Sequence, residues 1–195
     1  SYISLPSTLQ VINLVYFLCP QNQRYSTIKR FPLGDNIRWF TLCKFETFRA
    51  HYVEHSMDKT APYEGVKEML QECKRRNLFT AIVSNKLDPA VKDLHQAFFA
   101  DSIDVAIGET SGVKRKTAPD MVNKAILRLS LLHGKPIHPS ECIYVGDSEV
   151  DMLTAKNSEL PCISVSWGFR DRKFLVENGA KIIIDRPDEL FNHLS

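Results

Sequence analysis

The chain has 195 residues, of which 44% are hydrophobic and 25% are charged, the ordinary balance of a globular protein. A net charge of +2 and the lack of a long basic run argue against nucleic acid or an anionic membrane as a partner. Five cysteines without a C-x-x-C pair argue against a disulfide framework or a zinc site and indicate a reducing, cytoplasmic compartment. The longest apolar run, residues 11–19, is too short to span a bilayer.

Residues 1–60 are expected to be helical. Ser7 and Gln10 form a capping-box pattern behind Pro6, and apolar residues then recur at helical spacing. Residues 11–18 are also short and β-rich enough for a strand, but the capping pattern favours a helix. Further helices are predicted at 25–31 and 36–56, so we predict a helical domain over 1–60.

From residue 61 onward, short apolar runs alternate with amphipathic segments. This alternation is typical of a parallel sheet with helices on both faces, so we predict a Rossmann-like α/β core over 61–195. The predicted strands are 79–83, 103–107, 142–145, 162–165 and 181–184. The predicted helices are 65–76, 89–98, 119–132, 150–156, 171–178 and 187–194.

Two carboxylates follow the predicted strand 142–145. Gly146 and Asp147 end that strand, and Asp151 comes four residues later at the start of a predicted helix. Ligands of open α/β sheets bind at the carboxyl ends of the strands, and Mg²⁺ is usually held by one or two carboxylates together with water and phosphate. The pair therefore indicates a Mg²⁺ site, although an Asp that caps a helix gives the same pattern.

Two other segments carry polar residues to comparable positions. The strand 79–83 stops at Ser84 and Asn85, and Lys116 precedes a helix that begins with a proline. In this order, the three segments resemble the motifs of the haloacid dehalogenase superfamily of phosphohydrolases, and within it the phosphoglycolate phosphatase-like branch. The Pro-Tyr-Glu-Gly-Val segment at 62–66 and the Val-Ser-Trp-Gly-Phe segment at 165–169 resemble that branch too, and the resemblance covers about residues 60–190.

The resemblance implies a mechanism and a role for each residue. An Asp attacks phosphorus of a small phosphorylated metabolite, and water hydrolyses the resulting aspartyl-phosphate. Asp147 holds Mg²⁺, with Asp151 either as a second ligand or as a residue behind the ligands that anchors them. Ser84 and the backbone N–H of Asn85 bind a phosphoryl oxygen, and Lys116 offsets the charge of the transition state. Lys116 and Asp147 are then the catalytic residues, and residues 1–60 correspond to the mobile cap of this branch.

The family's nucleophile belongs to an Asp-x-Asp-Gly-Thr segment that ends the first core strand, and this chain contains no such segment. By the resemblance, the missing strand lies at the centre of the sheet, between the strands that end at Ser84 and Asp147. We therefore expect the strand and its nucleophile upstream of Ser1, a core at 61–195 that lacks its first strand, and no turnover by residues 1–195 alone.

Alternatives stay open. A relative without a nucleophile would act as a binding or regulatory module, and a phosphosugar mutase would carry its additional carboxylate in the missing segment. His51 and His55 have a spacing able to bind a metal, but no third ligand is nominated, so we interpret them as a solvated or cap-packing face. The segment 167–169 either lines the mouth of the active site or has only a packing role within the fold.

Overall fold

A computed structural model describes residues 10–14 by their backbone and residues 61–194 with their side chains. The helices expected at 25–31 and 36–56, and the pair His51 and His55, lie outside the described residues. The chain divides into two units, one of residues 1–17 with 62–195 and one of residues 18–61. The described strands and helices all belong to the first unit.

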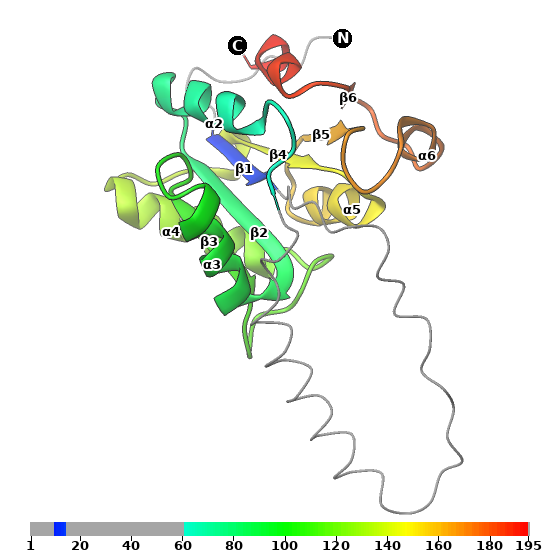
Figure 1. Cartoon of the computed structure of the whole chain (residues 1–195). Coiled ribbons are helices and arrows are strands. Elements are labelled where there is room, and N and C mark those ends of the chain that lie inside the picture. The colour runs from blue at the N-terminus through cyan, green and yellow to red at the C-terminus, as the bar shows by residue number, and fades with distance from the viewer. Residues whose placement is uncertain (1–9, 15–60, 195) are drawn as a thin grey trace, which may run out of the picture. The chain divides into compact units, whose positions relative to one another are not determined.

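Six parallel strands form one sheet in the order β3-β2-β1-β4-β5-β6 (Figure 1). The strands are β1 Gln10–Leu14, β2 Thr80–Leu87, β3 Val105–Glu109, β4 Cys142–Gly146, β5 Cys162–Val165 and β6 Ile183–Ile184. The α-helices are α2 Val66–Arg75, α3 Asp88–Phe98, α4 Asp120–His133, α5 Glu149–Asn157 and α6 Arg172–Glu177. Two 3₁₀ helices, η1 Pro139–Glu141 and η2 Pro187–His193, complete the order.

The strand β1 corrects two of our expectations. Residues 10–14 form a strand and not a helix, and they pair with β2 on one side and β4 on the other. The central position, which we expected 61–195 to lack, is therefore held by β1, and the cap predicted over 1–60 does not include these five residues. Ladders on both edges of a central strand outweigh a local capping signal, because intrinsic helix propensity is a weak preference that tertiary pairing overrides.

Helices cover both faces of the sheet. One core cluster joins β2, β3 and β4 to α4 and α5, with Val83, Tyr144 and Leu129 among its members. Ile82 and Ile143 alternate with cluster residues along their strands and are equally buried, so the opposite face is covered as well. The connection β2-α3-β3 runs outward and β3-α4-β4 runs back across the sheet, which puts α3 and α4 on opposite faces when both crossovers are right-handed.

The predicted elements of residues 61–194 are confirmed in type, with two differences. β2 continues to Leu87, and its register against β3 shifts between Val83 and Leu87. The last predicted helix is the 3₁₀ helix η2. No described helix combines the length and the apolar character that crossing a bilayer requires.

Candidate active site

The order in which strands are added to the sheet reverses at β1. The strands β2 and β3 lie on one side of β1, whereas β4, β5 and β6 lie on the other. Such a switch point opens a crevice at the carboxyl ends of the central strands, where open α/β sheets bind ligands. The ends of β2 and β4 carry Asn85 and Asp147 toward this edge. A ligand site is therefore expected where these two residues lie.

Asp147 follows β4 directly and is 8% exposed. Its Oδ2 accepts a hydrogen bond from the backbone N–H of Phe169 at 2.9 Å, whereas Oδ1 has no hydrogen-bond partner among the described residues. Burial, together with the negative charge of Asp151, raises the pKa of Asp147 to about 6. A buried carboxylate with one unused oxygen gains from a cation, because the cation supplies the stabilisation that water no longer gives.

Asp151 has both carboxylate oxygens occupied by protein donors. Oδ1 accepts from Lys116 Nζ at 2.7 Å and from the Tyr144 hydroxyl at 3.0 Å. Oδ2 accepts from Ser148 Oγ at 2.6 Å and from the Asp147 N–H at 3.2 Å. Burial favours the neutral acid, but the Lys116 ammonium and these hydrogen bonds hold the pKa of Asp151 below its usual range.

The beginning of α5 explains how Asp151 is placed. Ser148 is the N-cap of α5, and its hydroxyl accepts from the Asp151 N–H at 3.4 Å while donating to the Asp151 carboxylate. Asp151 occupies the third helical position, so the N-cap hydroxyl bonds to both its backbone N–H and its carboxylate. A side chain on Gly146 would put its Cβ 2.3 Å from Cβ of Asp151, so the glycine allows β4 and α5 to approach.

Lys116 meets these carboxylates from the loop before α4. Its side chain is 6% exposed and forms an ion pair with Asp151, which is 3% exposed. The backbone N–H and C=O of Lys116 both bond to the side chain of Asn85, at 2.8 and 3.1 Å. The structure thus joins Asn85, Lys116, Asp151 and Asp147 in one hydrogen-bonded chain.

Ser84 lies beside Asn85 in the part of β2 where the register shifts, and it is 3% exposed. Its Oγ accepts from the backbone N–H of Lys86 at 3.2 Å. Irregular strand segments of this kind redirect side chains and are frequent next to active sites. Ser84 is connected to the hydrogen-bonded chain through its neighbour Asn85.

The segment after β5 closes over Asp147. A Cβ on Gly168 would come within 2.3 Å of Cβ of Asp147, so only glycine allows this approach. Arg170 forms two hydrogen bonds to Glu149 of α5 and lies 4.6 and 4.2 Å from the ring centres of Phe169 and Phe174. Of the two roles considered for 167–169, the backbone at 168–169 therefore lines the site.

The residues present suit Mg²⁺ better than a transition metal. The described residues contain no group of three His, Cys, Asp or Glu side chains that could enclose a metal. Mg²⁺ needs only one or two carboxylates, because water and phosphate complete its octahedral shell. Asp147 has a free oxygen for it, whereas the oxygens of Asp151 already accept from Lys116, Tyr144 and Ser148.

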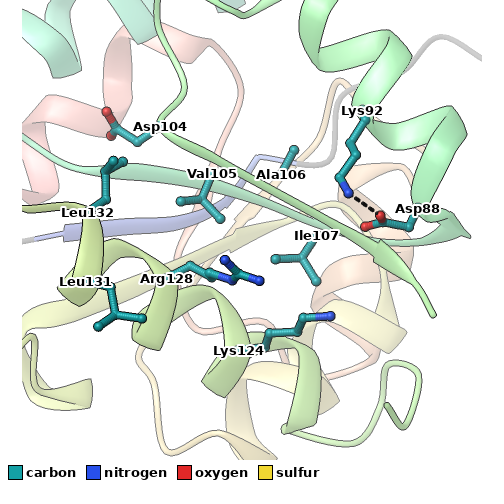
Figure 2. Close-up of a pocket in the computed structure, with 10 residues that line it drawn as sticks. All are labelled: Asp88, Lys92, Asp104, Val105, Ala106, Ile107, Lys124, Arg128, Leu131 and Leu132. Atoms are coloured by element: carbon teal, nitrogen blue, oxygen red, sulfur yellow. Dashed lines mark ion pairs between the residues drawn. The ribbon is translucent and has the colours of Figure 1, made fainter. Parts of the chain in front are cut away.

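A separate hollow of about 520 Å³ borders β3, away from this chain of residues (Figure 2). Asp104 lines it and donates from its backbone N–H to Thr80 at the start of β2. Asp104 therefore lies at the amino ends of the strands, at the opposite edge of the sheet from Asp147.

The sequence motifs did not reveal several contributors to this site. Three of them are donors of hydrogen bonds to the two carboxylates: Tyr144, Ser148 and the Phe169 N–H. The fourth, Gly168, allows the backbone to approach Asp147 closely. Only the Ser148-x-x-Asp151 capping pattern could have been found in the sequence. The side chain of Asn85 also differs from our expectation, which used only its backbone N–H.

Comparisons with known proteins agree with this geometry. The profile of the haloacid dehalogenase-like hydrolase family matches residues 18–165. A phosphoglycolate phosphatase of Rhodobacter capsulatus is 31% identical over 140 residues, which cover 71% of this chain and 57% of that protein. Pyrophosphatase PpaX of Bacillus mycoides is 28% identical over 149 residues, which cover 76% and 66%. The chain thus spans less than two thirds of the length of both relatives.

The crystal structure of a candidate phosphoglycolate phosphatase from Lactobacillus delbrueckii subsp. bulgaricus superposes with a TM-score of 0.69 at 34% identity. The superposition covers 85% of this chain and 67% of that one. The family profile, these relatives and the sheet order all agree with the resemblance that the motifs indicated. The chain belongs to the haloacid dehalogenase-like hydrolases and is similar to their phosphoglycolate phosphatases.

Proposed function

We propose that this chain provides the site of a Mg²⁺-dependent phosphatase that hydrolyses small phosphorylated metabolites. The observation that carries the proposal is the ion pair between Lys116 and Asp151, both nearly buried, directly beside Asp147 with its unused oxygen. A preorganised cation and a metal-binding carboxylate at one sheet edge are what phosphoryl transfer requires. The phosphatase and pyrophosphatase relatives make phosphoglycolate and pyrophosphate the first substrates to test.

Each residue has a proposed task. Asp147 would hold Mg²⁺, which neutralises charge on the phosphoryl oxygens when bound. Asp151 would orient Lys116 and Asp147, and it would be a direct metal ligand only after releasing one of its donors. Ser84 and the Asn85 N–H would donate to a phosphoryl oxygen. A cytoplasmic location is proposed from the cysteine pattern, and the described thiols Cys73, Cys142 and Cys162 are free.

The mechanism also needs a carboxylate that attacks phosphorus. We propose that an aspartate in a strand upstream of Ser1 forms the aspartyl-phosphate. Such a strand would compete with β1 for the central position, since β1 already pairs with both β2 and β4. The proposal therefore includes an exchange of β1 for the upstream strand.

One observation favours a second function, a phosphate- and Mg²⁺-binding module without turnover. β1 holds the centre of the sheet, and no Asp or Glu precedes Asp35 in the sequence. If β1 keeps this position, residues 15–34, which follow it directly in the sequence, contain no carboxylate to attack phosphorus. A phosphosugar mutase is a weaker alternative, because no described residue favours it.

The test compares residues 1–195 with a form that carries an additional strand and an Asp-x-Asp-Gly-Thr segment before Ser1. We expect Mg²⁺-dependent phosphate binding by both forms and hydrolysis of p-nitrophenyl phosphate, phosphoglycolate or pyrophosphate by the extended form alone. Binding without turnover in both forms would select the binding module. Turnover by residues 1–195 would refute the missing-nucleophile argument and make Asp35 the next candidate.

A further inference from the structure

The loop that carries Lys116 is held by two asparagine side chains. Oδ1 of Asn85 accepts from the Lys116 N–H at 2.8 Å, and Nδ2 of Asn85 donates to the Lys116 carbonyl at 3.1 Å. One amide side chain thus satisfies both backbone groups of one residue, in the way a neighbouring strand would. Asn157, the last residue of α5, donates from Nδ2 to the Thr117 carbonyl at 2.9 Å.

These three hydrogen bonds connect the loop to both elements that build the site. Asn85 comes from β2, next to Ser84, and Asn157 comes from α5, the helix that also carries Asp151. The far end of the Lys116 side chain bonds to Asp151 as well, at 2.7 Å. The lysine is therefore fixed at its backbone, at the following residue and at its amine.

The contact of Asn157 is informative because this side chain is exposed. Water would satisfy its amide in any orientation, so burial does not explain why it bonds to a residue 40 positions away in the sequence. The contact fixes the peptide that follows Lys116. A cation that is already in place stabilises a bound phosphate most strongly, because no reorganisation of the protein is needed when the phosphate arrives.

We propose that Asn85 and Asn157 are positioning residues, which hold the Lys116–Thr117 backbone against β2 and α5 and so fix the amine of Lys116 for phosphate. The proposal rests on the proposed function, since it takes Lys116 as the phosphate-binding cation. Without the two clamps the charge remains but its position varies, and a displacement of about 1 Å can cost up to about 100-fold at a reacting group.

Asn157→Ala and Asn178→Ala make a matched pair. Asn178 is also exposed at the end of a helix, and its Nδ2 also donates to a backbone carbonyl, Phe174 O, at 2.9 Å. In the 195-residue chain, amide hydrogen exchange of the peptide spanning 113–118 reports the clamp, and calorimetric titration with inorganic phosphate and Mg²⁺ reports its effect. We expect Asn157→Ala to speed exchange in that peptide and to weaken phosphate binding about 5- to 10-fold, whereas Asn178→Ala changes neither.

Asn85→Leu removes both bonds to Lys116, and we expect it to weaken phosphate binding about 10- to 30-fold. Asn85→Asp keeps the acceptor for the Lys116 N–H, so the exchange of that amide should be slower than in Asn85→Leu. A purely structural role predicts a lower Tm and faster exchange along all of β2, without the difference between the two Asn85 variants. The melting temperature is measured for all four variants for this reason.

Two results overturn the positioning role: unchanged exchange at 113–118 in both Asn157→Ala and Asn85→Leu, or faster exchange with parental phosphate affinity. Lys116→Ala separates this failure from that of the proposed function. If Lys116→Ala binds phosphate as the parent does, the proposed function fails and the positioning role fails with it. If Lys116→Ala loses phosphate while the asparagine variants keep it, only the positioning role fails.

Discussion

Replacing Asp147 by asparagine is expected to stabilise the metal-free protein while removing its response to Mg²⁺. The carboxyl has a pKa of about 6 in the folded state, raised first by burial and then by the charge of Asp151, against about 3.9 in an unfolded chain. A carboxyl with a raised folded pKa destabilises the fold as pH increases. The effect begins above the unfolded pKa near 3.9 and is complete above about pH 6.

The magnitude comes from this difference of about 2 pKa units, each equivalent to about 1.4 kcal/mol, and amounts to about 3 kcal/mol above pH 6. Asparagine avoids this penalty, but its carbonyl is a weaker acceptor for the Phe169 N–H, at a cost of about 1 kcal/mol. The net gain of about 2 kcal/mol corresponds to an increase in Tm of about 4–8 °C for a chain of this size.

The assay is thermal unfolding at pH 7.5 and at pH 5, in EDTA and in Mg²⁺. In EDTA at pH 7.5, the Tm of Asp147→Asn should be higher than that of the parent, and this difference in Tm should be smaller at pH 5. Addition of Mg²⁺ should raise the Tm of the parent but not that of Asp147→Asn. Asp101→Asn, at an exposed position, is the control: it should melt like the parent in EDTA and keep the parent's response to Mg²⁺. A variant that melts below the parent at pH 7.5 and keeps the Mg²⁺ response would refute the reasoning.

Three further substitutions test other parts of the site. Lys116→Ala should weaken phosphate binding on the order of 100-fold in calorimetric titrations, whereas the exposed Lys114→Ala should stay within about twofold of the parent. Asp151→Asn leaves the Lys116 ammonium buried without its counter-charge and should lower the free energy of unfolding, measured in urea, by about 3–5 kcal/mol. Gly168→Ala puts a Cβ 2.3 Å from Cβ of Asp147 and should reduce the increase in Tm that Mg²⁺ produces.

Each of these substitutions has a contradicting outcome. Equal losses for Lys116→Ala and Lys114→Ala would mean that the loop is a generic basic segment. Parental stability of Asp151→Asn would mean that water reaches the ammonium. A parental Mg²⁺ response of Gly168→Ala would mean that the backbone at 168–169 does not set the position of Asp147.

The sequence predicted most of the core because its elements are locally encoded. Between residues 61 and 194, apolar runs and amphipathic helices follow the periods of strands and helices, and all strands were found within a few residues. The failure at Gln10–Leu14 has the opposite cause. A strand in the centre of a sheet depends on partners far away in the sequence, here β2 and β4, and a capping pattern at Ser7 outweighed a signal that only those partners explain.

In the site, too, locally encoded features were predicted and features that depend on distant residues were not. Asp147, Asp151, Lys116 and Asn85 were nominated from their motifs, and the structure joins them. The resemblance left Asp151 as either a second metal ligand or an anchor behind Asp147, and the structure shows how the two carboxylates differ: both oxygens of Asp151 already accept from protein donors, whereas Oδ1 of Asp147 does not. Whether both oxygens of a carboxylate are already hydrogen-bonded depends on neighbours such as Tyr144, and no local sequence pattern predicts that contact.

The two ends of the sheet differ in their exposure to other molecules. Among the described strands, β6 ends the sheet with only two residues, whereas β3 ends it with five. Lys92, Lys124 and Arg128 border the β3 edge together with Asp88, which pairs with Lys92, and Asp104 (Figure 2). Because these cations outnumber the carboxylates, an approaching copy of the same edge would meet a small excess of like charge. This repulsion is screened by salt. Self-association along β3, the usual first step of edge-to-edge aggregation, should therefore become favourable at high ionic strength before it does so in dilute buffer.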